Sequence, residues 1–165
     1  MYSVIRSFGL NGLNGFAVAV EADVSGGMPA LSIVGLPDSA VRESGDRVRS
    51  AVKNLGYKWP DRHITVNLAP ADIRKSGPVY DLPLLLAVLA ASGQLEPPSK
   101  DTAFLGELAL DGSLRPVSGV LPMALEAAAG GVRALYVPAE NAAEAAEACG
   151  SEMQVYPAAT ARQVV

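Results

Sequence analysis

The feature that most constrains this chain is an uninterrupted run of ten apolar residues, Leu82 to Ala91. It has about half of the roughly 20 residues that a membrane-spanning helix needs. Pro83 fits only if a helix begins close to Tyr80 or Asp81, because a first-turn residue has no internal hydrogen bond to lose. The run therefore predicts a buried helix, and 165 residues are enough for one domain that encloses it.

The first third of the sequence predicts strands. Ser3–Leu10 and Phe16–Val24 alternate between apolar and polar residues, and two Asn-Gly pairs between them are typical of a turn. Gly26-Gly27 then leads into a third run, Ala30–Val34. We expect these three runs to form an antiparallel meander.

A helix is expected next, because Asp38 is a good N-cap and apolar residues follow it at helical spacing as far as the stop at Gly56. Gly45 lies in the middle of this helix and costs about 1 kcal/mol of helix propensity. Close packing against a neighbouring element is the expected reason for it.

The remaining expected elements alternate between strands and helices. They are the strand His63–Leu68, the apolar helix, the strand Ala103–Leu110, a helix from Pro122 to Gly130, the strand Leu135–Val137, the helix Asn141–Cys149 and a last strand Met153–Tyr156. Antiparallel and βαβ units are mixed in this order, so the sequence predicts an α+β fold with layered packing.

Charge is divided unevenly along the chain. Between Arg42 and Lys75 there are eight basic and four acidic residues, a net charge of +4, whereas the part from Ser76 onward carries −6. A +4 segment is a modest signal for nucleic acid, and we interpret it as a solvated helix face. Cys149 is alone and no signal peptide is visible, so we expect residence in the cytoplasm and no membrane association.

Two stretches carry a family resemblance. Ala69–Pro83 contains the loop before the apolar helix, and Gly106–Leu121 has the pattern G-E-x-x-L-x-G-x-x-x-P-V-x-G, followed by a helix and the strand end V-P-x-E-N. These resemble the Lon protease domain and the matching domain of the DNA-repair ATPase RadA. The resemblance implies a sheet with helices mostly on one face, as in the second domain of small-subunit ribosomal protein five.

The beginning of the chain makes the resemblance narrower. Phe16–Glu21, Ser32–Asp38 and Val41–Ser44 look like the start of the magnesium-chelatase-like ATPases of the ComM (YifB) family. In that family this domain comes first and an AAA+ ATPase module follows. The resemblance therefore implies that residues 1–165 are a single Lon-like domain and the N-terminal part of a longer chain.

Lon-type proteolysis needs a serine nucleophile and a desolvated lysine that takes its proton. By the resemblance, the serine follows the Gly-Pro of the loop, where this chain has Val79, and the lysine lies two residues after the Gly of Pro-Val-x-Gly, where it has Leu121. Both side chains are apolar. We therefore expect no catalytic residues in this segment, and we interpret the neighbouring Lys75 and Ser76 as a solvated lysine and a loop serine.

Other chemistry is sparse. No G-x-x-x-x-G-K-[ST] phosphate loop occurs, so no cofactor is expected in this segment, and ATP with Mg²⁺ is expected in the ATPase module. The single histidine, His63, has no nearby ligands and is interpreted as structural, so no metal site is expected.

Asp81 is expected to cap its helix or to form an ion pair, with Arg74 as the partner considered. Tyr57 and Trp59 fit either stacking on single-stranded bases or a hydrophobic clamp at the end of the first helix.

The family resemblance implies an ATP-driven, ring-forming motor that promotes DNA branch migration during natural transformation and recombination. In it, this domain would be a scaffold that contacts DNA or a partner, with its own ATPase module and a hexameric homo-oligomer as expected partners. The candidate DNA contacts are basic residues that would bind phosphates without reading sequence. They are Arg42, Arg47, Arg49, Lys53, Arg74 and Lys75.

Three alternatives remain open at this point. One is an active Lon-like serine peptidase, which Val79 and Leu121 disfavour. Another is a subunit of a true magnesium chelatase, although the segment shows no cluster of metal ligands. A third is an oligomerisation module without DNA contact.

Overall fold

The computed structural model describes residues 1–165. The strands are β1 (Tyr2–Asn11), β2 (Asn14–Ser25), β3 (Ala30–Val34), β4 (His63–Ala69), β5 (Thr102–Phe104), β6 (Glu107–Leu108), β7 (Leu114–Arg115), β8 (Ala134–Pro138) and β9 (Gln154–Ala158). The helices are α1 (Ser39–Asn54), α2 (Asp81–Ala91), α3 (Val120–Ala129) and α4 (Ala142–Ala146), with short 3-10 turns η1 (Pro78–Tyr80), η2 (Ala139–Asn141) and η3 (Ala161–Gln163).

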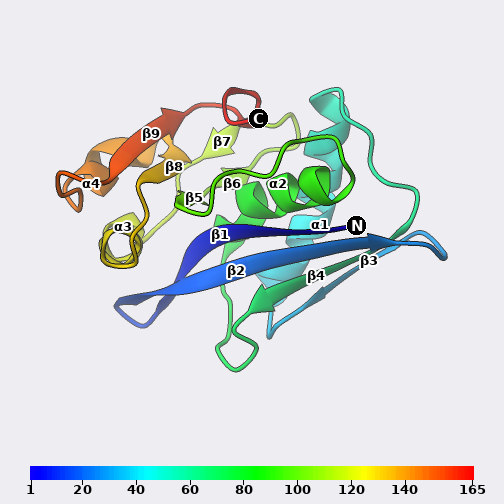
Figure 1. The fold of residues 1–165 in the computed structure, drawn as a ribbon, viewed down its shortest axis with the longest axis horizontal. Coiled ribbons are helices and arrows are strands. Elements are labelled where there is room, and N and C mark those ends of the chain that lie inside the picture. The colour runs from blue at the N-terminus through cyan, green and yellow to red at the C-terminus, as the bar shows by residue number, and fades with distance from the viewer.

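Seven of the strands form one mixed sheet in the order β3-β4-β2-β1-β5-β8-β9 (Figure 1). The hairpin of β1 and β2 pairs from Tyr2 opposite Asp23 to Asn11 opposite Asn14, as the Asn-Gly turn residues predict. β6 and β7 form a separate two-stranded hairpin. The predicted α+β class is confirmed.

The apolar run forms the centre of the fold. Every residue of α2 is buried, and α2 lies against β1 and β2, with α1 packed against it in turn. Along β2, Val18, Val20, Ala22 and Val24 are buried, whereas Ala17 and Asp23 on the other side of the strand are exposed. One face of the β1–β4 part of the sheet is therefore covered by the core and the other is open, as expected for helices mostly on one face.

The expected antiparallel meander is wrong for the third strand. β3 pairs in parallel with β4, and β4 lies between β2 and β3. The physical reason is the connection through α1: a helix between two neighbouring strands lets the chain return to the same end of the sheet and run in the same direction. β3 is consequently an edge strand.

The expected strand Ala103–Leu110 is interrupted in the structure. After β5 the chain leaves the sheet at Leu105-Gly106, where the Gly106 N–H donates to the Val79 carbonyl at 3.0 Å and the Gly106 carbonyl accepts from the Leu82 N–H at 3.0 Å. These bonds tie the segment to the start of α2. A contact distant in sequence therefore ends a strand that the local alternation would continue.

Three other bounds differ from expectation. α3 begins at Val120, two residues before Pro122. The alanine-rich helix Asn141–Cys149 is reduced to η2 and the five residues of α4, and the last strand is shifted to Gln154–Ala158.

α1 agrees with its prediction. The Asp38 carboxylate accepts from the Val41 N–H at 2.8 Å, which satisfies one of the free amides of the first turn. Gly45 is buried, and a Cβ built on it would lie 2.8 Å from Leu31 Cδ2. The expected close packing is thus against the edge strand β3.

Candidate functional site

The loop between β4 and α2 corresponds to the part of the chain in which a Lon-type nucleophile is expected. It pairs with the connection between β3 and α1: the Lys75 N–H donates to the Leu36 carbonyl at 3.0 Å, and the Asp38 N–H donates to the Lys75 carbonyl at 2.9 Å. Asp38 Oδ2 also accepts from the Gly77 N–H at 3.3 Å. The N-cap of α1 therefore also fixes the loop that precedes α2.

The interpretation of Lys75 as a solvated lysine is wrong. Its side chain is fully buried, and the ammonium group donates to the Gly35 carbonyl, at 3.0 Å, and to the Pro70 carbonyl. Burial lowers the pKa of Lys75, because the charged form loses hydration. Lys75 is a bridge between two loops and offers no charge to a phosphate at the surface.

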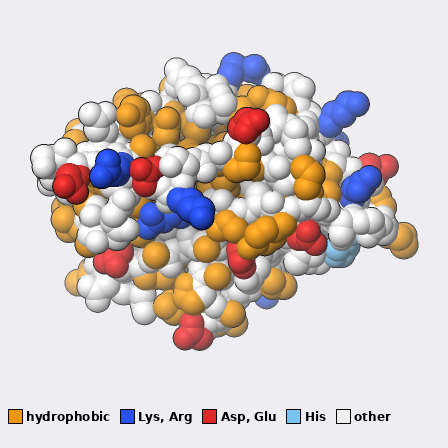
Figure 2. All heavy atoms as spheres, viewed as in Figure 1, with side chains coloured by type: hydrophobic (Ala, Val, Ile, Leu, Met, Phe, Trp, Pro, Cys, Tyr) orange, Lys and Arg blue, Asp and Glu red, His pale blue; other side chains and the backbone are white.

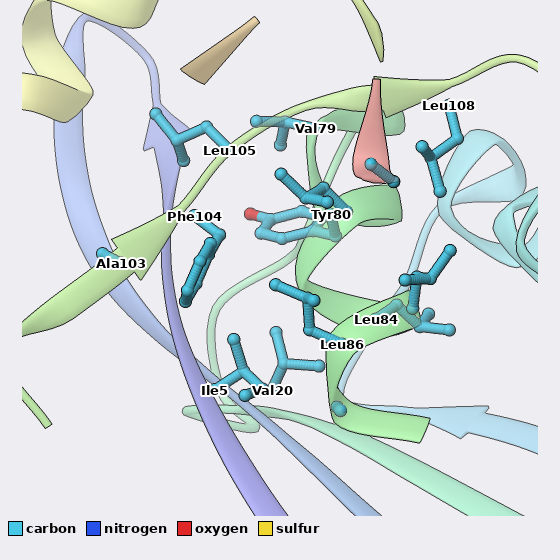
Figure 3. Close-up of a cluster of buried hydrophobic side chains, with 14 of the residues drawn as sticks. Ile5, Val20, Val79, Tyr80, Leu84, Leu86, Ala103, Phe104, Leu105 and Leu108 are labelled. Carbon is cyan, nitrogen blue, oxygen red and sulfur yellow. The ribbon is translucent and has the colours of Figure 1, made fainter. Parts of the chain in front are cut away.

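Val79 lies in the η1 turn, after Gly77, whose φ of 81° favours glycine. Its side chain is 7% exposed and belongs to the main apolar core. Figure 3 shows it beside Leu105, at the edge of the cluster that contains the ring of Tyr80. A hydrocarbon side chain here has neither a nucleophilic atom nor a proton to exchange.

Leu121 lies in the first turn of α3 and is half-buried. Its backbone N–H donates to Glu144 Oε2 at 2.9 Å, which joins α3 to α4. Neither Leu121 nor Val79 lines any of the five main surface hollows. The two positions carry packing and backbone contacts.

Tyr80 is a residue that the sequence reasoning did not single out. Its ring is fully buried, and its hydroxyl has no hydrogen-bond partner. The hydroxyl lies against Gly9, where an added Cβ would overlap it at 2.0 Å. Burial, with a smaller effect of the Asp38 charge, raises the pKa of Tyr80. Its position directly after Val79 was the available signal.

Asp81 is fully buried, and its partner is Arg47, not Arg74 as expected. The Arg47 guanidinium donates to Oδ2 through Nε at 2.7 Å and to Oδ1 through Nη2 at 3.1 Å. The carboxylate also accepts from the Ser44 hydroxyl at 2.5 Å and from the Leu108 N–H at 3.0 Å. Asp81 thus joins α1, α2 and β6 and satisfies a buried charge with four hydrogen bonds.

The structure divides the six candidate DNA contacts into two groups. Lys75 is buried, and Arg47 is engaged with Asp81, the Ala40 carbonyl and the Ser44 hydroxyl. The side chains that remain exposed are those of Arg42, Arg49, Lys53 and Arg74.

Two hollows bring these four exposed basic residues together. One hollow of about 420 Å³ is lined by Arg42, Arg49 and Lys53, and another of about 470 Å³ is lined by Arg42 and Arg74. Both also contain acidic side chains, Asp46 and Asp61 in the first and Asp38 in the second. On the face drawn in Figure 2, basic and acidic side chains are likewise interspersed.

The aromatic pair after α1 is partly buried. Tyr57 and Trp59 pack against the main core, as in the hydrophobic-clamp interpretation. Trp59 also lines two hollows, one of them the hollow with Arg49.

His63 begins β4, half-buried, opposite Ala30. No group of three or more His, Cys, Asp or Glu side chains that could hold a metal ion is present, and no helix is long and apolar enough to cross a membrane.

A seven-stranded mixed sheet around a buried helix is a fold consistent with that of Lon-related domains. Residues 20–141 match the family described as subunit ChlI of Mg-chelatase. The chain belongs to this family, in the group that contains YifB and ComM.

Several relatives cover most of the chain. An uncharacterised protein of Mycobacterium tuberculosis is 47% identical over 90% of it, YifB of Salmonella typhimurium 46% over 86%, and the competence protein ComM of Haemophilus influenzae 43% over 99%. Lon protease 3 of Sorangium cellulosum is 29% identical over 84%. The chain spans 28 to 32% of the length of the first three relatives and 17% of the Lon protease.

Proposed function

We propose that this domain is a non-catalytic module of a ComM-like, ATP-dependent protein that moves DNA branch points during transformation and recombination. The observation that carries the proposal is the apolar chemistry at Val79 and Leu121, together with the 43% identity to the competence protein ComM. In this role the domain acts through its surface and its rigidity, and ATP with Mg²⁺ binds to a module in the rest of a longer chain.

ATP binding is assigned to the rest of the longer chain because of the motif that residues 1–165 lack. They contain no Gly-rich phosphate loop of the G-x-x-x-x-G-K-[ST] type, and their one buried lysine is bonded to two backbone carbonyls. The proposal therefore assigns no step of ATP hydrolysis to these residues. It assigns assembly, as a hexamer, to the full-length protein.

The test is ATP-driven migration of a branched DNA by the full-length protein. Changing Val79 to Ala and Leu121 to Met keeps both positions apolar, and we expect migration to continue with both changes while fluorescent casein stays intact. Degradation of casein by the unchanged protein, abolished by Ser76→Ala, would show that the domain is a peptidase and would refute the proposal.

A direct DNA contact is a second candidate, favoured by the four exposed basic residues Arg42, Arg49, Lys53 and Arg74. Phosphate contacts of this kind weaken steeply with salt, because each one releases counterions. We expect Arg49→Glu to weaken binding to single-stranded and branched DNA in fluorescence anisotropy at low salt. Arg133→Glu, also at an exposed position but on the β8 side of the domain, is the matched control. Equal affinities of the two variants would remove this candidate.

A further inference from the structure

β3 has one unpaired edge. It is the last strand of the sheet, and the Ala30 N–H donates to the Arg62 carbonyl on the β4 side at 3.4 Å (Figure 1). In a parallel ladder the bonded residues alternate, so Ala30, Ser32 and Val34 face β4. The N–H and C=O groups of Leu31 and Ile33 therefore point to the side on which β3 has no neighbouring strand.

Two surface hollows lie beside this edge. The hollow of about 420 Å³ lies between the beginning of β3, the outer side of α1 and the loop Trp59–Asp61. A second hollow of about 270 Å³ is lined by Leu31, Ile33 and Arg42. We refer to these two hollows together as the β3–α1 groove. Leu31 lines both hollows, and Ile33 lines the second.

The α1 side of the groove carries three basic side chains and one acidic side chain, Asp46, and Asp61 lies in the loop Trp59–Asp61. Arg42, Arg49 and Lys53 stand seven and then four residues apart, so they project from one side of the helix. At 1.5 Å per residue they extend over about 16 Å, close to the length of a five-residue strand at about 3.3 Å per residue. The groove thus has three cations against two carboxylates, a net charge of +1, beside a strand with unpaired backbone groups.

We propose that the β3–α1 groove binds an extended, acidic peptide segment of a partner protein as an additional strand. The peptide backbone pairs with the Leu31 and Ile33 amides and carbonyls, and alternate side chains, about 7 Å apart on one face of a strand, place carboxylates near Arg42, Arg49 and Lys53. DNA phosphates would use the same charges but would leave the edge of β3 unpaired. The free edge is the reason to favour a peptide, and the inference does not depend on the proposed function.

The probe is a fluorescent peptide of alternating Glu and Val, about eight residues long, which matches a typical strand with room at both ends. The control is the same peptide with N-methyl groups on alternate amides. One edge of this peptide has no N–H groups to donate to a neighbouring strand. We expect the parent to bind and the methylated peptide to bind at least about tenfold more weakly. In hydrogen exchange, the amides of Leu31 and Ile33 should gain protection only with the parent peptide.

Charge is tested separately. Arg49→Glu should weaken binding of the unmethylated parent peptide about tenfold or more. Arg133→Glu should leave the affinity for this peptide unchanged. Equal binding of the two peptides, absence of binding by the parent, or binding without protection at Leu31 and Ile33 would each overturn the proposal. The proposal would also be overturned if an oligodeoxynucleotide displaced the fluorescent peptide at a lower concentration than the unlabelled parent peptide does. It would equally be overturned if sedimentation showed a dimer whose contact already protects the amides of Leu31 and Ile33.

Discussion

Two charged side chains of this domain, those of Lys75 and Asp81, lie fully inside the fold, and each is satisfied by different groups. Lys75 is bonded to backbone carbonyls of two loops, whereas Asp81 is bonded to a guanidinium, a hydroxyl and an amide. A buried charge is tolerated only when such partners are present, so removal of one partner has a larger effect than the same change at the surface.

Asp81→Ala should lower the free energy of unfolding by about 3–5 kcal/mol, because it leaves the Arg47 guanidinium and the Leu108 N–H without their partner. Urea denaturation of the two proteins measures the difference. Glu43→Ala is the matched control, since Glu43 is 3.8 Å from Arg47 but 70% exposed, and it should cost at most about 0.5 kcal/mol. Similar losses in both variants would contradict the role assigned to Asp81.

Because the Lys75 ammonium is buried, we expect the free energy of unfolding to depend on pH in a defined direction. Burial lowers its pKa from the ordinary 10.5, so between the lowered pKa and 10.5 the unfolded chain binds a proton that the folded chain does not. The contribution of Lys75 to the free energy of unfolding therefore rises with pH in this window. Tyr80 has the opposite slope above its ordinary pKa of 10.0, because burial raises its pKa.

Comparison with Lys75→Met separates the two groups. Both proteins keep Tyr80, so the difference in their free energies of unfolding reports Lys75. We expect the wild type to gain stability relative to Lys75→Met as the pH rises toward 10.5. A difference that stays constant, or that shrinks over this window, would show that the ammonium is not buried as described.

At the scale of elements, the joint between β3 and α1 is the tightest backbone crossing near the candidate site. Gly35 has a φ of 102°, and an added Cβ would lie 2.3 Å from the Leu68 carbonyl oxygen and 2.9 Å from its backbone nitrogen. Backbone atoms of a central strand cannot move aside as a side chain can. The glycine therefore allows the chain to leave β3 directly over β4 and enter α1.

Gly35→Ala should destabilise the domain by about 2 kcal/mol or more, since it combines an unfavourable φ with a backbone clash. Thermal unfolding measures the loss. Gly26→Ala serves as the control, because Gly26 has open space around its Cα and no positive φ, and it should change the stability by no more than about 0.5 kcal/mol. A neutral Gly35→Ala variant would mean that the joint is looser than its geometry indicates.

The elements also show which parts of the fold the sequence predicts. The β1–β2 hairpin, α1 and α2 follow from local signals: Asn-Gly turn residues, the Asp38 cap and the apolar run. The place of β3 and the interruption at Gly106 do not, because both depend on contacts between residues far apart in the chain. The pairing of Asp81 with Arg47 is of the same kind, since nothing in the spacing of the two residues separates Arg47 from Arg74 as a partner.

At the scale of the whole molecule, the domain is a Lon-like fold that belongs to the Mg-chelatase ChlI family and resembles about a third of each ComM or YifB relative. The apolar residue types at the two expected dyad positions follow from the sequence and its resemblance to Lon-type domains. Their packing does not: Val79 is part of the apolar core, and the lysine nearest to it in sequence, Lys75, is bonded to two loops. The proposal that this domain is non-catalytic rests on this combination of a Lon-like fold with apolar side chains at the expected dyad positions.

The most direct test of that claim is labelling of the full-length protein with a fluorophosphonate, followed by peptide mass spectrometry. A serine activated by a neighbouring base forms a stable adduct with this reagent, whereas an ordinary hydroxyl does not. The account predicts no adduct on any serine, including the exposed Ser76 beside the buried Lys75. Stoichiometric labelling of Ser76 that is lost in Lys75→Met would contradict it.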